Sequence, residues 1–317
     1  MANYLTIDGG TTNTRINLVA EGEILDIAKL RIGVKSNING KDTYKNEIKK
    51  GIQTILENND MSESDIERII CSGMITSELG LCPLEHLKLP CGIYELGRGL
   101  YEIVIDEISE IPFVFIRGVK NECGSFEESD IMRGEETELL GITDNPEPGC
   151  LYVLPGSHSK LIYIDDEGRI EHFSTELTGE IIEAIATGTI LKDVIDLNNT
   201  EIDEQFLQKG YMYAKENGVN SAFFKVRILK TMFSCNDVQT YSFFIGAALS
   251  AEIENIIKSA PNKVIIAGKK QLKLPISILL NKNSDKETEC VGDDVSEFAA
   301  TYGMVKIYGH VFNKAML

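Results

Sequence analysis

A strand–turn–strand segment occurs twice in this chain of 317 residues, once at the start of each half. Residues 5–24 align without a gap on residues 151–170, and six of the twenty positions are identical, including two glycines in each copy. Each copy has apolar, β-branched flanks around a short turn of glycine and hydroxyl residues, which is the pattern of a β-hairpin. The repeat therefore predicts two domains of one architecture, each beginning with the same hairpin.

The remaining pattern fits two α/β domains of ordinary size. In the first half we expect strands at residues 3–8, 14–19, 23–32, 67–72 and 111–116, and helices at 42–58 and 129–141. In the second half we expect strands at 150–155, 159–165, 169–174 and 263–267, and helices at 180–195, 204–217, 221–234, 242–258, 272–280 and 294–308. The turn-rich segment 143–149 separates the halves, so we predict domains over residues 1–145 and 146–317, with the last helix free to pack back on the first domain.

The net charge limits the binding partners to expect, and the cysteines indicate the cellular compartment. With 31 basic and 49 acidic residues the net charge is −18, which repels nucleic acid and anionic membranes. The seven cysteines include no CxxC pair, so reduced thiols in a cytoplasmic protein fit better than a disulfide framework or a zinc site. The apolar runs are too short to span a bilayer, and no signal peptide precedes the first strand. We expect a cytoplasmic protein with small-molecule ligands, and homo-oligomerisation stays open.

The two turns are candidate anion sites. Residues 8–13 (DGGTTN) and 154–160 (LPGSHSK) combine small residues with hydroxyls, and successive backbone N–H groups in such turns form a concavity that binds anions. Two such turns, one in each domain, could hold a polyphosphate in a cleft between the domains. Neither a Walker loop nor a dinucleotide-binding fingerprint is present, because each turn leads into a strand. Ordinary hairpin turns are the alternative.

These turns and a third segment, 130–137 (DIMRGEET), resemble the 2-dehydro-3-deoxygalactonokinase family, part of the sugar kinase/Hsp70/actin superfamily. Smaller matches at 72–75, 244–248 and 264–268 extend the resemblance to most of the chain, although Gly9 and Leu161 stand where tryptophans are usual in the family. The resemblance implies two ribonuclease H-like domains of the actin/hexokinase type. Each would have a mixed β-sheet that starts with three strands and is flanked by helices. The active site would lie in the interdomain cleft, with sugar and phosphate binding in the first domain and nucleotide binding in the second.

The activity that the resemblance implies is that of a carbohydrate kinase. It would use ATP and Mg²⁺ to phosphorylate 2-dehydro-3-deoxy-D-galactonate at its 6-hydroxyl. Three alternatives stay open: a kinase for another sugar or keto-deoxy sugar acid, a non-catalytic nucleotide-binding sensor, and a phosphohydrolase on the same scaffold.

The resemblance places cofactor contacts in both turns. Asp8 would hold Mg²⁺ through water, or alternatively would bond to N–H groups of its own turn. The other cofactor contacts are expected from Gly9, Gly10, Thr11, Thr12, Asn13, Arg15, Gly156, Ser157, His158, Lys160 and Gly268. For three of these a structural role is the alternative: a surface strand for Arg15, a turn for His158 and a strand end for Gly268.

Asp130 is the expected general base, because related sugar kinases place an aspartate at the start of the helix that leaves the first domain. Aspartate is also a good helix N-cap, which is the alternative reading. Arg133 would lie one turn later on the same helix face. It could bind the carboxylate of a sugar acid or the transferring phosphate, or pair with Glu135 or Glu136.

Further substrate contacts are expected from Gly73, Ser77 and Glu135. Gly134 would lie inside the helix, where glycine costs about 1 kcal/mol relative to alanine, so a close approach by a ligand or another backbone is expected there. Outside the turns, His86, His172 and His310 show no ligand spacing and are expected to be structural.

Overall fold

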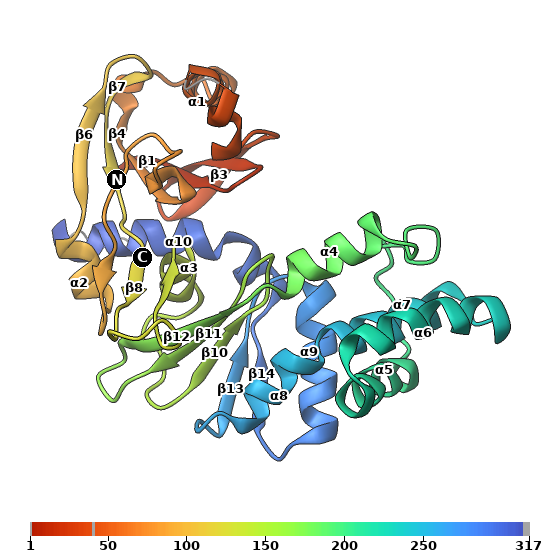
Figure 1. The fold of residues 1–317 in the computed structure, drawn as a ribbon. Helices are drawn as coiled ribbons and strands as arrows, with labels where there is room; N and C mark the ends of the chain where they lie inside the picture. Colours follow the sequence, from red (N-terminus) through yellow and green to blue (C-terminus); the bar gives the residue numbers. More distant parts are fainter. Residues whose placement is uncertain (1, 40–41, 313–317) are drawn as a thin grey trace. The chain divides into compact units, whose positions relative to one another are not determined.

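The structure is a computed structural model that describes residues 2–39 and 42–312. The chain forms two compact units (Figure 1). Unit 1 comprises Met1–Pro148, Asp165–His172 and Glu297–Leu317, and unit 2 comprises Gly149–Ile164 and Phe173–Ser296. The first unit is therefore discontinuous in sequence.

The six-stranded sheet of unit 1 has the order β3-β2-β1-β4-β7-β6. Its strands are β1 (Asn3–Gly9), β2 (Thr14–Ala20), β3 (Glu23–Leu30), β4 (Ile66–Gly73), β6 (Tyr101–Ile105) and β7 (Ser109–Phe115). β1 pairs antiparallel with β2 and parallel with β4, so the expected start of three consecutive strands is confirmed. The amphipathic helix α1 (Asp42–Asn58) contributes Ile48, Ile52 and Ile55 to the core of this sheet, as its helical spacing predicts.

A small sheet and a short helix replace the helix expected over residues 129–141, so that prediction was wrong. β9 (Asp130–Met132) pairs antiparallel with β8 (Val119–Asn121), which pairs in turn with β5 (Leu87–Lys88). Helix α3 (Glu135–Ile142) begins only after Gly134, whose φ of 110° does not continue a helix. Asp130 and Arg133 consequently share no helix face. Unit 1 also holds helix α2 (Ile93–Arg98) and the 3-10 turns at Val34–Asn39, Glu63–Asp65 and Met74–Thr76.

The five-stranded sheet of unit 2 has the order β12-β11-β10-β13-β14. Its strands are β10 (Leu151–Leu154), β11 (Ser159–Ile164), β12 (Ile170–Glu176, which starts within the residues of unit 1), β13 (Lys263–Ile266) and β14 (Glu287–Cys290). β10 pairs antiparallel with β11 and parallel with β13, as β1 does with β2 and β4. The sequence repeat thus marks the same hairpin in two sheets of the same arrangement, and the expected α/β fold class is confirmed.

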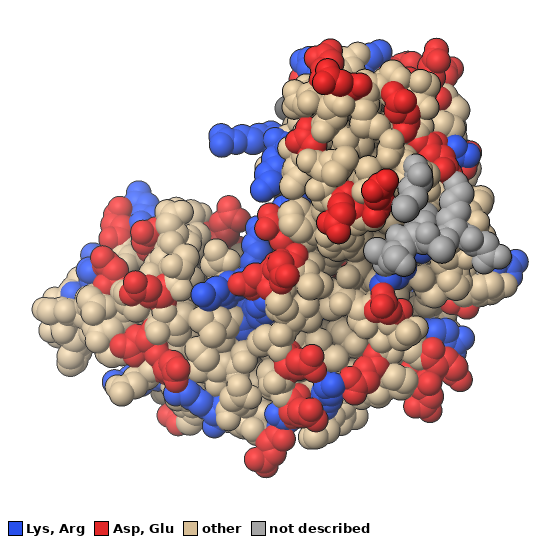
Figure 2. All heavy atoms as spheres, turned by 180° about the vertical axis from the view of Figure 1, so that it is seen from behind, with Lys and Arg blue, Asp and Glu red and all other residues tan. Residues whose placement is uncertain are grey.

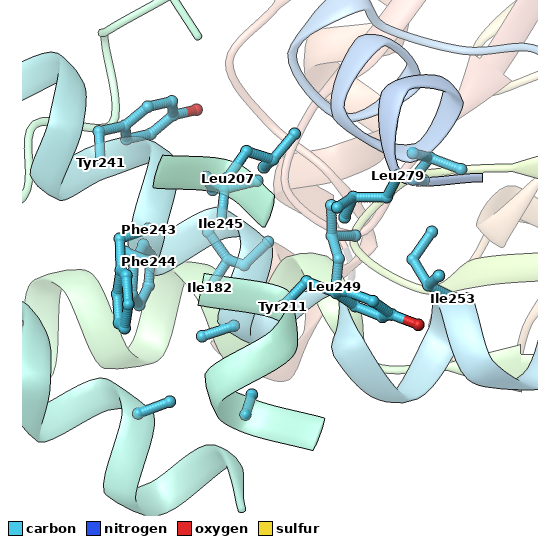
Figure 3. Close-up of a cluster of buried hydrophobic side chains, with 14 of the residues drawn as sticks. Ile182, Leu207, Tyr211, Tyr241, Phe243, Phe244, Ile245, Leu249, Ile253 and Leu279 are labelled. Carbon is cyan, nitrogen blue, oxygen red and sulfur yellow. The ribbon is translucent and has the colours of Figure 1, made fainter. Parts of the chain in front are cut away.

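The helices that follow are α4 (Thr178–Gly188), α5 (Glu204–Asn217), α6 (Val219–Met232), α7 (Asp237–Ala248), α8 (Ser250–Lys258), α9 (Lys270–Asn283) and α10 (Asp293–Phe312). The single helix expected over 242–258 is two helices, separated at Leu249. Figure 3 shows the apolar core to which helices α4 to α9 contribute, with Tyr211, Phe244 and Ile253 among its fully buried members. Burying one such side chain contributes about 1.5–3 kcal/mol, so this cluster stabilises much of unit 2.

Helix α10 completes unit 1, since its residues from Glu297 onward belong there. The amide of Asn17 donates to the hydroxyl of Thr301, and the ammonium of Lys306 donates to the Leu140 carbonyl at 2.7 Å. At Gly303 a Cβ would come within 1.9 Å of the Thr137 carbonyl oxygen, so α3 and α10 lie backbone against backbone.

The cysteines and the surface charges of the structure can be compared with the sequence composition. All seven cysteines are free thiols. Acidic side chains are spread over the face seen in Figure 2 rather than gathered in one patch. Among the described residues, no helix combines the length and the apolar character that a membrane span requires.

Candidate active site

The first turn, residues 10–13, is anchored through its carbonyl groups. Gly10 and Thr11 accept hydrogen bonds from the backbone N–H groups of Val34 and Lys35, each at 3.2 Å. A Cβ at Gly33 would lie 2.4 Å from the Thr11 carbonyl carbon, so only glycine allows this close support. Within the described ranges, the N–H groups of Thr11 and Thr12 donate to no protein acceptor. The turn therefore keeps the donors that an anion would use.

Asp8 stands beside this turn, near the end of β1 and directly across from Arg15 on β2. Burial raises the pKa of Asp8 most, Glu135 raises it further, and the charge of Arg15 lowers it. The Arg15 guanidinium also donates to the Glu297 carbonyl at 2.6 Å and lies 6.0 Å from the centroid of the Phe298 ring. Arg15 is thus the cation that balances Asp8, and its expected contact with phosphate stays a prediction.

Two glycines bring three chain segments together at Asp8. Gly73 ends β4 with a φ of 86°, and a Cβ there would lie 2.8 Å from the Gly9 carbonyl oxygen and 3.4 Å from Asp8 Oδ1. At Gly134 a Cβ would lie 3.3 Å from the Cα of Gly73. The ends of β1 and β4 and the start of α3 therefore meet at one place, which is how Gly9, Gly73 and Glu135 come near Asp8.

The first turn of α3 is acidic and lies against this meeting point. Glu136 is fully buried and accepts the Gly134 N–H at 3.0 and 2.9 Å through its two oxygens. The pKa values of Glu136 and Glu138 are raised to about 8, mainly by burial, with further contributions from the charge of Glu135 to both and from Asp8 to Glu138. Glu135 accepts the Arg133 N–H at 3.1 Å. Glu135 and Glu138, both in the first turn of α3, interact electrostatically with Asp8.

Asp130 lies on the three-residue strand β9, opposite Asn121. Its Oδ1 accepts the N–H of Ile131 at 2.7 Å. The premise that put Asp130 in the catalytic position, a helix starting there, is corrected: the helix starts five residues later, at Glu135. A glycine directly before the acidic pair is the sequence signal for that later start.

The Arg133 guanidinium is held by neutral acceptors. It donates to the Thr76 hydroxyl and to the Leu84 carbonyl, each at 2.8 Å, and lies 3.5 Å from Nδ1 of His86. In the described part of the chain no carboxylate forms an ion pair with it, so the expected pairing with Glu135 or Glu136 is not found. Sequence reasoning treated His86 as structural and missed this contact, which joins residues 47 apart.

Ser77, expected at the substrate, uses its hydroxyl within its own turn, where it donates to the Met74 carbonyl at 2.7 Å. Its neighbour Thr76 is the residue that meets Arg133. The expected substrate contact of Ser77 stays a prediction.

The second turn, in unit 2, has open space at its glycine. A Cβ at Gly156 would meet no heavy atom within 4 Å, whereas one at Gly179 would lie 2.2 Å from the Gly156 carbonyl oxygen. The Ser157 carbonyl accepts the Glu180 N–H at 3.1 Å, which fixes the start of α4 to the turn. Within residues 2–39 and 42–312, no acceptor takes the N–H groups of Gly156, Ser157 or His158.

Other predicted residues of unit 2 surround this turn. Gly268 follows β13 with a φ of 90°, and a Cβ there would lie 3.0 Å from the Pro155 carbonyl oxygen. The exposed imidazole of His158 lies 3.2 Å from Glu180 Oε1, and Lys160 is 3% exposed. Parallel strands β10 and β13 end at the same edge of the sheet, which explains why Gly268 reaches the turn.

A buried carboxyl group, that of Glu252 on α8, bonds to the start of helix α4, which follows this turn. The hydroxyl of Thr178, the first residue of α4, donates to Glu252 Oε2. Burial is the main cause that raises the pKa of Glu252 to about 7. No sequence pattern identified this residue, because its partner lies 74 positions away.

Comparisons with known proteins agree on one family. The model of the 2-keto-3-deoxy-galactonokinase family matches residues 8–300. The chain is 25% identical over 261 residues to the 2-dehydro-3-deoxygalactonokinase of Escherichia coli (strain K12), covering 80% of each protein. It is 31% identical over 199 residues to DgoK1 of Rhizobium meliloti (strain 1021), named for the same activity, covering 61% of this chain and 59% of that protein.

A solved structure of a candidate 2-dehydro-3-deoxygalactonokinase from Sinorhizobium meliloti has the same fold, with a TM-score of 0.77 and 22% identity. The match covers 98% of this chain and 100% of that one. The family match includes both turns and the acidic start of α3. The chain belongs to the 2-keto-3-deoxy-galactonokinase family.

Proposed function

We propose that the protein transfers the γ-phosphoryl group of ATP to the 6-hydroxyl of 2-dehydro-3-deoxy-D-galactonate. The observation that carries the proposal is the family match over residues 8–300, which contains every segment of the site. In this proposal unit 1 binds the sugar acid beside Asp8, and the turn of unit 2 binds phosphates of the nucleotide. The free thiols fit work in the reducing cytoplasm.

Phosphate binding is assigned to backbone donors. In the first turn these are the N–H groups of Thr11 and Thr12, with the side chains of Thr12 and Asn13 exposed beside them. In the second turn they are those of Gly156, Ser157 and His158. Donors that are already oriented cost no reorganisation when charge develops on the transferring group. Gly268, whose backbone approaches Pro155, is proposed to lie at the adenine.

Asp8 fits a role toward Mg²⁺. Among the described residues, no three His, Cys, Asp or Glu side chains are grouped to hold a metal ion. One carboxylate beside a phosphate-binding turn suffices for Mg²⁺, because this ion keeps several waters and takes further ligands from the phosphates. When bound, Mg²⁺ neutralises charge on the phosphate oxygens. Asp8 would hold it through water, and the charge of Arg15 would favour the ionised carboxylate against burial, which raises the pKa of Asp8.

Glu135 is proposed as the general base that takes the proton of the attacking hydroxyl. It stands at the start of α3, where the resemblance requires a base, and it acts on the pKa of Asp8. A general base has to lie within hydrogen-bond reach of the hydroxyl that it deprotonates. Asp130, bonded to its own neighbour on β9, is the alternative base that the sequence favoured.

The decisive experiment measures ADP release by the full chain with ATP and Mg²⁺, with and without a panel of 3-deoxy-2-keto sugar acids. The proposal requires release that depends on the sugar acid and is fastest with the galactonate derivative. Release without sugar would make the protein a phosphohydrolase, and binding of ATP without release would make it a sensor. Faster turnover of another acid in the panel would change the substrate while keeping the reaction.

A further inference from the structure

The Arg133 guanidinium has the surroundings of an anion receptor. The protein carries a net charge of −18, yet within the described residues no carboxylate forms an ion pair with this side chain. Its hydrogen bonds to Thr76 and Leu84 go to a hydroxyl and a carbonyl, which leave the positive charge in place. The side chain is partly buried, so this charge is only partly screened by water.

His86 completes the support of the guanidinium. An arginine nitrogen can only donate, so Nδ1 of His86, at 3.5 Å, accepts from Arg133 when the imidazole proton is on Nε2, which has no hydrogen-bond partner among the described residues. Burial and the charge of Arg133 lower the pKa of His86 to about 4, so the ring is neutral near pH 7. Contacts with Thr76, Leu84 and His86 thus fix the orientation of the Arg133 guanidinium without neutralising its positive charge.

Arg133 and Asp8 belong to two ends of one site. The charge that lowers the pKa of Asp8 is that of Arg15, whereas the charges that act on Arg133 are those of Glu136 and Glu78. The ends are joined by a short piece of chain: Gly73 contacts Asp8, and Thr76, three residues on, contacts Arg133. The guanidinium of Arg133 is thus bonded to a residue only three positions along the chain from Gly73, which lies beside Asp8, the place proposed for phosphoryl transfer.

The proposed substrate has matching ends. Its carboxylate is C1 and the hydroxyl that receives phosphate is C6, at the other end of the six-carbon chain. Resting on the proposed function, we propose that Arg133 binds the C1 carboxylate, with His86 as its positioning residue, while the 6-hydroxyl lies at Asp8 and Glu135. A planar guanidinium binds a carboxylate through two parallel hydrogen bonds, which fixes the orientation of the acid. Selection for a sugar acid over a neutral sugar follows from this contact.

The test compares the sugar acid with its C1-alcohol analogue, a 3-deoxy-2-ketohexose of the same configuration. Binding of both is measured by calorimetry, and KM and kcat by ADP release. For Arg133→Met we expect a loss of about 10- to 100-fold in affinity for the acid, unchanged affinity for the alcohol and unchanged KM for ATP. For His86→Phe we expect a smaller loss of about 2- to 10-fold, again confined to the acid. His86→Gln, which keeps an acceptor, should recover part of it.

Arg117→Met is the matched control. Arg117 donates to the carbonyls of Gly99 and Glu85, at 2.9 and 3.2 Å, and among the described residues it shares no hydrogen bond with Arg133 or His86. This variant should keep the full preference for the acid. Equal losses for acid and alcohol in Arg133→Met, or a higher KM for ATP with unchanged KM for the acid, would overturn the inference. An intact preference in a wild type that binds both compounds but releases no ADP would instead refute the kinase proposal alone.

Discussion

Gly134 lies directly against Gly73: a Cβ on Gly134 would meet the Cα of Gly73 at 3.3 Å. The two glycines have φ values of 110° and 86°, which other residues rarely adopt. With no side chain between them, the end of β4 and the start of α3 approach closely enough for Glu135 to act on the pKa of Asp8. Both carboxylates of the proposed site therefore depend on this one contact.

Replacing Gly73 with alanine should destabilise the protein and its site together. The φ of 86° and ψ of −154° form a conformation open in practice only to glycine, and strain of this kind costs about 1–3 kcal/mol. Crowding against the Gly9 carbonyl oxygen, 2.8 Å from the new Cβ, adds to that cost. Urea unfolding and ADP release measure the two effects. Gly124→Ala is the control, because Gly124 has a φ of 82° but no heavy atom within 4 Å of its Cβ position. Equal losses in both variants would mean that strain, not the approach to Asp8, is decisive.

Glu135→Gln and Asp130→Asn separate the two candidate bases. Each change removes a negative charge and keeps nearly the same shape. If Glu135 takes the proton, Glu135→Gln should lower kcat by about 10²- to 10⁴-fold, and Asp130→Asn should change it only a few-fold. Affinity for ATP, measured by calorimetry, should stay the same in both variants. The reverse pattern of kcat values would restore Asp130 as the base.

Gly156→Ala tests the second turn without disturbing the fold. The new methyl group would meet no protein atom within 4 Å, so the free energy of unfolding should hardly change. It would, however, stand where phosphate oxygens are proposed to approach the backbone. We expect a loss of at least about tenfold in ATP affinity, or 1.4 kcal/mol. Gly188→Ala, also without neighbours within 4 Å but at the end of α4, should bind ATP normally. Unchanged ATP affinity in Gly156→Ala would place the nucleotide elsewhere.

Asp8→Asn should change the response to Mg²⁺ more than the fold. The amide keeps the size of the side chain but has no charge to attract a hydrated cation. The Mg²⁺ concentration for half-maximal rate should rise about 10- to 100-fold, as when other partners of metal-bound water are removed. Titrating Mg²⁺ at saturating ATP and sugar acid measures it. An unchanged midpoint would show that Asp8 only stabilises its turn.

The pH dependence of stability should carry the signature of Glu252. Its folded pKa of about 7 exceeds its ordinary value of 4.5, so the folded state holds a proton that the unfolded state has released between these values. The contribution of Glu252 to the free energy of unfolding should therefore be most favourable below pH 4.5 and should fall as the pH rises toward 7. The slope is at most about 1.4 kcal/mol per pH unit. Glu252→Gln should make the slope shallower without removing it, because the raised pKa values of Glu136 and Glu138 act in the same direction. The thermal midpoint from pH 5 to 8 measures the slope. The same slope in the variant would assign it to other groups.

The parts of the fold that depend on neighbouring residues could be predicted from the sequence. The hairpin β1–β2 and its repeat β10–β11 follow from alternating apolar residues and glycine-bearing turns, which act over a few neighbours. The helices at 42–58 and 204–217 have the expected bounds, because their apolar stripes run their full length. Membership of the family was likewise readable from short segments.

The errors arose where distant partners decide the structure. Residues 129–133 favour a helix locally, but Met132 pairs with Val119 in a strand, and tertiary pairing overrides propensity. β6 and β14 are strands at the edges of their sheets that no pattern identified. The contacts of Arg133 with His86 and of Glu252 with Thr178 join side chains 47 and 74 residues apart, beyond the range of any periodicity.

The discontinuous first unit has a consequence for synthesis. Asn17 bonds to Thr301, and Leu140 to Lys306; both partners follow the whole of unit 2 in the chain and so leave the ribosome after it. N-terminal domains usually fold first during translation. Here residues 149–164 and 173–296 have all been made before the N-terminal unit receives its final helix. The first unit therefore cannot finish folding before unit 2 has been synthesised, and nascent chains paused before residue 297 would expose the surface that α10 later covers.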